Sequence, residues 1–206
     1  AGGIFLEGIT ALIAGEGSLP VAIASRLTDM GTPPVVYSLR ESVGPLSRYS
    51  LDIVKLSKPD MGFAIGEMKK RGVANIIMAG TVSKTLAFKP SLFDLTTQKF
   101  LAGLMFRDDH SLLGAIVDFL EKQGFRVLSY KDIIADLLAP AGQIAGRAPT
   151  KEERADIDYG RSICKVLVPL SFGQTIVVNK RAVIAVEAME GTDATLLRAG
   201  SLCRGG

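Results

Sequence analysis

Three carboxylates lie within seven residues of one another, at a place in the sequence where they could act on a phosphate: Glu187, Glu190 and Asp193. The apolar run at 183–188 predicts a strand buried on both faces, and the charge of Glu187 would be costly to bury there without a partner. A helix is predicted directly after Asp193, and its N-terminus would attract anions. Several acids beside it would repel a phosphate unless a cation lay between them. The pattern therefore suggests a phosphate site bridged by Mg²⁺.

The same residues have a purely structural interpretation. Thr192 or Asp193 would cap the helix that continues through 194–197, and the acids would be solvated. Residue types and spacing alone do not decide between a capped helix and a cation site, so both interpretations stay open at this point.

A second group of candidate residues follows a strand predicted at 9–13. The turn after this strand contains Gly15 and Gly17, and a helical pattern follows at 21–30. Strand, glycine-rich turn and helix in this order start a Rossmann-like fold, in which the glycines let the backbone approach a ligand. Pro20 replaces the third glycine of the dinucleotide motif, and no clear ribose-binding acid ends the next strand. The sequence therefore predicts a nucleotide-type crevice without an NAD site.

A third group follows another buried strand, predicted at 73–79. Its members are Gly80, Thr81, Ser83 and Lys84. In a doubly wound sheet the loops after the carboxyl ends of the strands line the binding crevice, which places this group on one rim with Gly15 and Gly17. Ser83 and Lys84 could hold a phosphate or a sugar hydroxyl there, and an ordinary polar loop is the alternative.

The elements predicted up to residue 138 alternate between strands and helices. Further strands are predicted at 35–38, 53–56 and 125–129, and further helices at 58–71, 90–105, 107–124 and 131–138. This alternation predicts the α/β class with a Rossmann-like parallel sheet. Asp108 and Asp109 lie at the start of one of these helices, where capping and the macrodipole alone favour aspartate. They therefore rank below the other acids as candidates.

A change of composition at 139–150, where prolines and glycines lie among small residues, marks a boundary. It predicts a Rossmann-like N-terminal domain at 1–140, a linker at 141–149 and a smaller α+β C-terminal domain at 150–206. The elements predicted in the C-terminal domain are a capping box at 150–153 that opens a helix to about 168, strands at 174–178 and 181–188 around a tight Asn179-Lys180 turn, and a last helix.

Composition narrows the classes of function. The 206 residues carry a net charge of +3, without a basic run interleaved with aromatic residues, which argues against a nucleic acid partner. No apolar run is long enough to cross a bilayer, and the first residues lack the pattern of a secretory signal, so we expect a cytoplasmic protein. Cys164, Cys203 and the single histidine, His110, argue against a disulfide framework and against a zinc site.

Several of these motifs occur together, in this order and at this spacing, in one known family. They are IAGEGSLP at 13–20, AGTVSK at 79–84, DD at 108–109, EKQGF at 121–125, ADID at 155–158, GQ at 173–174 and AVEAMEGTD at 185–193. On these motifs the chain resembles the LpxI type of UDP-2,3-diacylglucosamine pyrophosphatase. The resemblance covers nearly all of the chain, and the last motif is its most specific part.

The resemblance implies a reaction, a cofactor and a set of site residues. The reaction is Mg²⁺-dependent hydrolysis of the pyrophosphate of UDP-2,3-diacylglucosamine to UMP and lipid X (2,3-diacylglucosamine 1-phosphate), in the lipid A biosynthesis of Gram-negative bacteria. Catalysis and Mg²⁺ binding are expected from Glu187, Glu190 and Asp193. Substrate contacts are expected from Gly15, Gly17, Ser18, Leu19, Gly80, Thr81, Val82, Ser83, Lys84, Asp108, Asp109, Gln174, Gly191 and Thr192.

Because this substrate carries two acyl chains, peripheral contact with the inner membrane is expected. Family members continue for several dozen residues beyond the point where this chain ends, so the resemblance also implies a C-terminally incomplete member. Two other functions stay open: a non-catalytic nucleotide- or lipid-binding module, and a nucleotide-sugar transferase that uses a sugar acceptor in place of water. A homo-oligomer is also considered, but the sequence does not determine the oligomeric state.

Overall fold

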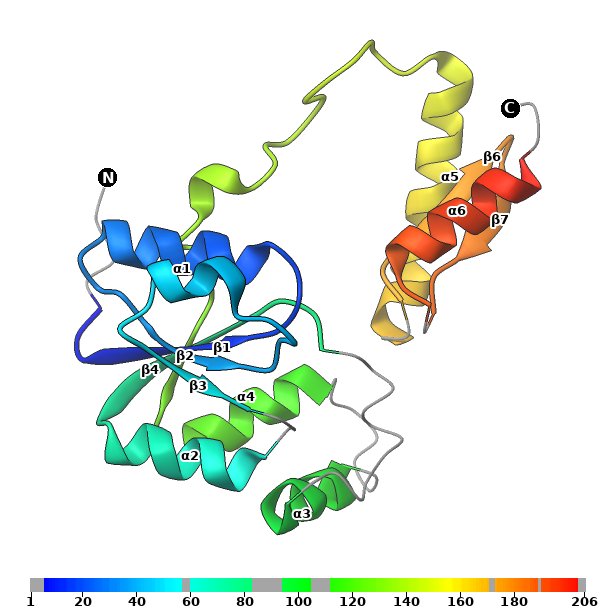
Figure 1. Cartoon of the computed structure of the whole chain (residues 1–206). Coiled ribbons are helices and arrows are strands. Elements are labelled where there is room, and N and C mark those ends of the chain that lie inside the picture. The colour runs from blue at the N-terminus through cyan, green and yellow to red at the C-terminus, as the bar shows by residue number, and fades with distance from the viewer. Residues whose placement is uncertain are drawn as a thin grey trace. The chain divides into compact units, whose positions relative to one another are not determined.

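The structure, a computed structural model, describes residues 6–56, 60–82, 94–104, 112–170, 173–188 and 190–203. The chain divides into two compact units, Ala1–Leu138 and Ala139–Gly206, and each unit has its own sheet (Figure 1). Within the described residues, no helix combines the length and the apolar character that a membrane span requires.

The first unit alternates strands and helices, as its sequence predicts. Its elements are β1 (Ile9–Ala14), α1 (Leu19–Asp29), β2 (Val35–Ser38), η1 (Gly44–Arg48), β3 (Asp52–Lys55), α2 (Met61–Lys70), β4 (Val73–Ala79), α3 (Leu95–Leu104), α4 (Leu112–Lys122), β5 (Arg126–Leu128) and η4 (Ala135–Leu137). The five strands are all parallel and lie in the order β3-β2-β1-β4-β5. This order confirms the predicted Rossmann-like sheet.

Both faces of this sheet are covered by helices, α1 on one face and α2 with α4 on the other (Figure 1). Side chains of β1 alternate between the two cores: Leu12 packs with Ile23 and Leu27 of α1, whereas Ala11 packs with Met68 of α2. Alternate residues of a strand point to opposite faces. Burial on both faces therefore explains why these strands read as continuous apolar runs in the sequence.

The helix predicted at 131–138 is wrong in type. The chain makes a turn in which the N–H groups of Ile133 and Ile134 both donate to the carbonyl of Tyr130, and a short 3₁₀ helix, η4, follows. Ile133 and Ile134 are both buried in the core on the α1 side. The packing of these two side chains against the core, rather than the helical pattern of the sequence, therefore decides the backbone of this segment.

The second unit consists of two helices and a hairpin. Its elements are α5 (Lys151–Leu167), η5 (Val168–Leu170), β6 (Ile176–Asn179), β7 (Ala182–Val186) and α6 (Thr192–Leu202). The strands pair antiparallel in a two-stranded sheet, which confirms the predicted hairpin and the α+β character of this unit. The expected burial of the second strand on both faces is wrong, because β7 has a single partner strand and only Ala185 in it is buried.

The hairpin turn lies one residue later than predicted, at Lys180 and Arg181. Both residues have positive φ values, 51° and 59°, as a two-residue hairpin turn of the primed type requires. Their backbone N–H groups donate to the two carboxylate oxygens of Asp156 in α5, at 2.9 and 2.6 Å. Because a charged acceptor satisfies both N–H groups, a carboxylate on α5 offsets the cost of the left-handed backbone.

The predicted capping box at the start of α5 is confirmed. The Thr150 side chain accepts from the Glu153 N–H at 3.2 Å, and the Glu153 carboxylate accepts from the Thr150 N–H at 2.7 Å. Arg147 adds two charged hydrogen bonds to the same carboxylate, at 2.6 and 2.7 Å. The Arg147 guanidinium and the Thr150 N–H together lower the pKa of Glu153 from 4.5 to about 2.

This capping arrangement predicts a stability that depends on pH. The folded-state pKa of Glu153 is depressed, so its contribution is present above about pH 4.5 and is lost as the pH falls towards 2. We expect Glu153→Gln to lower the thermal stability of the second unit at pH 7 and to make progressively less difference below pH 4.5. Melting curves of both proteins across this range test it. A difference that stayed constant with pH would contradict the role of the charge.

Candidate functional site

The first candidate site lies where β1 and β4 run side by side. The chain moves from β1 outward to β2 and β3 and then returns to β4 on the other side of β1. This reversal is the topological switch point, at which open α/β sheets bind ligands beside the carboxyl ends of their strands. Gly15 and Gly17 follow β1 here, and Gly80, Thr81 and Val82 follow β4.

The structure joins these two loops through their backbones. Glu16 and Thr81 exchange two hydrogen bonds, N–H to O, of 2.8 and 2.9 Å, and the Gly15 N–H donates to Ala79 at 2.8 Å. A Cβ on Gly15 would lie 2.6 Å from the Thr81 oxygen, and one on Gly80 would lie 2.7 Å from the Glu16 oxygen. Only glycine fits at either position, because the two backbones lie too close together to leave room for a side chain. The two loops are therefore as close as the sequence predicts.

The remaining candidates of these loops surround this backbone junction. Gly17 has a φ of 99°, Ser18 is the N-cap residue of α1 without a side-chain capping bond, and Leu19 begins the helix. Val82 is 43% exposed beyond the junction. The other predicted residues of this group, Ser83, Lys84, Asp108 and Asp109, lie outside the described residues. Among the described candidates of the first unit, the groups available to a ligand are therefore backbone groups rather than catalytic side chains.

Glu187 is the first residue after β7, and its side chain is buried, as its place in an apolar run requires. Its carboxylate accepts from the Gln174 N–H at 3.3 Å and from the Thr192 hydroxyl at 3.1 Å. A Cβ on Gly173 would lie 2.0 Å from the Glu187 carbonyl oxygen. The charge predicted to need a partner therefore receives protein hydrogen bonds, and Glu187 ties the segment at 173–175 to the start of α6.

Glu190 is also held by protein groups. It accepts from the Ala188 N–H at 3.1 Å and from the Thr195 hydroxyl at 3.3 Å, and its carboxylate lies 3.4 Å from the Arg198 guanidinium. Hydrogen bonds from its own N–H and from that of Ala188, with the Arg198 charge, lower the pKa of Glu190 below its ordinary value. The carboxylate is therefore ionised at neutral pH, which suits charge stabilisation and not general acid catalysis.

The predicted cap of the last helix is wrong. Its N-cap residue is Gly191, with a φ of 85°, and Thr192 and Asp193 are the first two residues of α6. A glycine adopts this backbone conformation without strain, and it leaves the Thr192 hydroxyl available to Glu187. Asp193 is exposed in the first turn, and its side chain forms no hydrogen bond or ion pair with any residue that the structure describes.

The three acids do not form a ready-made cation site. Among the residues of known placement, no three His, Cys, Asp or Glu side chains are grouped so that they could hold a metal ion. Glu187 and Glu190 face N–H and hydroxyl donors, whose hydrogens would be repelled by a cation. The donors present therefore do not fit a three-carboxylate Mg²⁺ site, and magnesium stays a prediction. Asp193 is the acid that remains open to a ligand.

Sequence reasoning missed Arg40, which lies two residues beyond the end of β2. Its guanidinium donates to the carbonyl oxygens of Gly15 and Gly17, at 3.2 and 2.6 Å. The dinucleotide-binding motif has a ribose-binding acid near this position, after the second strand. The basic residue that stands there instead is the signal that would have found Arg40, since side chains at this edge of the sheet reach the first loop.

Comparison with known proteins identifies relatives of both units. The model of the LpxI N-terminal domain matches residues 9–137, and that of the LpxI C-terminal domain matches residues 140–206. A protein of Caulobacter vibrioides, named UDP-2,3-diacylglucosamine pyrophosphatase LpxI, is 33% identical over 195 residues. These cover 93% of this chain and 69% of that protein. The matches confirm the resemblance that the sequence motifs indicate.

Proposed function

This chain belongs to the LpxI family, and we propose that it hydrolyses the pyrophosphate of UDP-2,3-diacylglucosamine to UMP and 2,3-diacylglucosamine 1-phosphate, a step of lipid A biosynthesis. The observation that carries the proposal is the identity of 33% over 93% of the chain to a relative with this activity in its name. The position of the two glycine loops at the switch point of the first unit supports it, because open α/β sheets bind ligands such as nucleotides at that point.

Direct attack by water is the simplest mechanism for this reaction. The oxygen of water bonds to one phosphorus, and the bridging oxygen leaves with the other phosphate, so no covalent enzyme intermediate is needed. We propose that the exposed carboxylate of Asp193 orients this water or accepts its proton. Glu187 and Glu190 then act by holding the segments at either end of the β7–α6 connection.

Product analysis tests the proposal. We expect the enzyme to release UMP and the diacylated sugar phosphate in equal amounts from UDP-2,3-diacylglucosamine, with one ¹⁸O atom incorporated per turnover in ¹⁸O water. Release of UDP in place of UMP, only after a sugar acceptor is added, would support a nucleotide-sugar transferase instead. Tight binding of the lipid nucleotide without any UMP release would support a non-catalytic binding module. Peripheral contact with the membrane stays a prediction from the two acyl chains of this substrate.

A further inference from the structure

The Arg40 side chain is largely buried and donates to two carbonyl oxygens of the first glycine loop. Only 13% of its side chain is exposed. Its Nη1 atom donates to the Gly15 oxygen at 3.2 Å and to the Gly17 oxygen at 2.6 Å, while Nε donates to the Ser42 oxygen at 3.1 Å. Hydrogen bonds from a charged and largely buried donor are stronger than neutral ones, so this side chain restrains the loop conformation.

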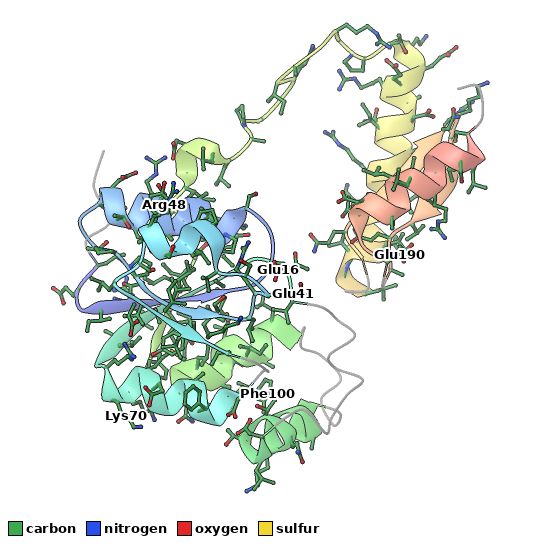
Figure 2. All side chains as sticks on the ribbon, viewed as in Figure 1. Glu16, Glu41, Arg48, Lys70, Phe100 and Glu190 are labelled. Carbon is green, nitrogen blue, oxygen red and sulfur yellow. The ribbon has the colours of Figure 1, made fainter. Side chains whose placement is uncertain are left out.

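Glu16, between the two glycines, adds a second connection to the same segment. Its carboxylate accepts from the Glu41 N–H at 2.9 Å and lies 3.9 Å from the Arg40 guanidinium. Figure 2 shows Glu16 and Glu41 beside each other at this edge of the sheet. The Glu16 side chain is 53% exposed, so its ion pair contributes little by itself. The bonds from Arg40 to the two carbonyl oxygens are therefore the main restraint.

Because the peptide bond is planar, the contacts of Arg40 with these two carbonyls also set the direction of the N–H group that follows each carbonyl. In a trans peptide the C=O and the following N–H point in opposite directions. The Gly15 carbonyl faces Arg40, and the N–H of the same peptide donates to Thr81 on the other side. The Gly17 carbonyl also faces Arg40, so the Ser18 N–H points away from it. No acceptor for that N–H lies among the residues that the structure describes.

The loop and Arg40 border an open cavity of about 630 Å³. Its lining residues are Gly17, Ser18, Val21, Ala22, Ser25, Arg40, Pro45 and Tyr49. If the carbonyl of Gly17 turned towards a ligand in this region, its partial negative charge would repel phosphate oxygens. Held by Arg40, the same peptide offers an N–H donor instead.

We propose that Arg40 is a positioning residue that fixes the first glycine loop, so that the Ser18 N–H and not the carbonyls of Gly15 and Gly17 faces the diphosphate of the substrate. This inference rests on the proposed function for the identity of the ligand. Arg40 follows β2, whereas the other candidate residues of this site lie in the loops after β1 and β4. The guanidinium acts through the backbone and does not touch the reacting atoms.

Arg40→Met tests the inference, because methionine keeps an unbranched side chain and removes the charge and all donors. The loop holds the diphosphate equally in the ground state and the transition state, so KM should rise by at least about tenfold while kcat changes less than about threefold. Amide hydrogen exchange at 15–19 should also become faster in the absence of substrate. Arg40→Lys keeps the charge but lacks the planar fork, so its effects should be intermediate.

Arg48→Met is the matched control. Arg48, labelled in Figure 2, ends η1 and is exposed. Its side chain forms no hydrogen bond or ion pair with any described residue. Arg48→Met removes the same charge as Arg40→Met, but from a residue that does not bond to the glycine loop. KM and amide exchange at 15–19 should therefore not change. If Arg40→Met also leaves KM unchanged, or lowers kcat only in proportion to the folded fraction, the positioning role is overturned.

The amide exchange result separates this inference from the proposed function. If the unsubstituted enzyme releases no UMP from UDP-2,3-diacylglucosamine, the proposed function fails. Faster exchange at 15–19 in Arg40→Met would then still support the positioning of the loop, because that measurement requires no substrate. Unchanged exchange would overturn the positioning role whether or not the enzyme is active.

Discussion

Asp193→Asn is expected to lower the turnover of UDP-2,3-diacylglucosamine by at least about tenfold, a loss of roughly 1.4 kcal/mol of transition-state stabilisation. Asparagine keeps the size of the side chain and removes the negative charge that would orient water or attract a cation. Asp193 is exposed in the first turn of α6, and its side chain forms no hydrogen bond or ion pair with any described residue. The measurement is turnover per folded molecule, compared with the unsubstituted enzyme.

Thermal stability distinguishes a catalytic role of Asp193 from a role in stabilising the start of α6. Loss of a negative charge in the first turn costs at most about 1 kcal/mol through the macrodipole, so the melting temperature should change little. Glu152→Gln is the matched control, because Glu152 is the second residue of α5 as Asp193 is of α6, and it is likewise exposed. We expect Glu152→Gln to retain turnover. Wild-type turnover in Asp193→Asn would remove that residue from the site.

Gly80→Ala is expected to lower the free energy of unfolding of the first unit by about 3 kcal/mol. Gly80 has a φ of 88°, which costs an L-residue energy whatever its surroundings. The added Cβ would also lie 2.7 Å from backbone atoms of Gly15 and Glu16, and backbone atoms cannot rotate aside as a side chain can. The strain therefore falls on the Glu16–Thr81 bridge that joins the two loops.

The control for this prediction adds the same methyl group where there is space. Gly66 lies within α2, and no atom is within 4 Å of the position that a Cβ would take. Gly66→Ala should stabilise the first unit by up to about 1 kcal/mol, because alanine favours a helix interior over glycine. Urea denaturation of both variants measures the change in the free energy of unfolding, which should be negative for Gly80→Ala and positive for Gly66→Ala. If Gly80→Ala left the midpoint unchanged, the tight backbone junction would not exist in solution.

The fold of the first unit could be predicted because its cause is local in the sequence. Apolar runs such as 73–79 identify strands that are buried on both faces, and helical patterns between them require crossovers within one parallel sheet. The closeness of Gly15 and Gly80 then follows from topology. The errors are in the elements that end a unit or lack neighbours, such as the segment at 131–138, where packing against a core decided the backbone.

The sequence alone was enough to predict the sheet, its switch point, the two glycine loops, the capping box at Thr150 and the family to which the chain belongs. All of these depend on side-chain type and spacing within short segments. The folded chain was needed to show that Gln174 and Thr192 donate hydrogen bonds to Glu187, and that Arg40 holds the carbonyls of Gly15 and Gly17. In both cases a charged side chain bonds groups brought to it from another segment, several of them backbone groups. Every residue carries such groups, so residue types do not reveal these partners, and only the folded chain selects which of them meet.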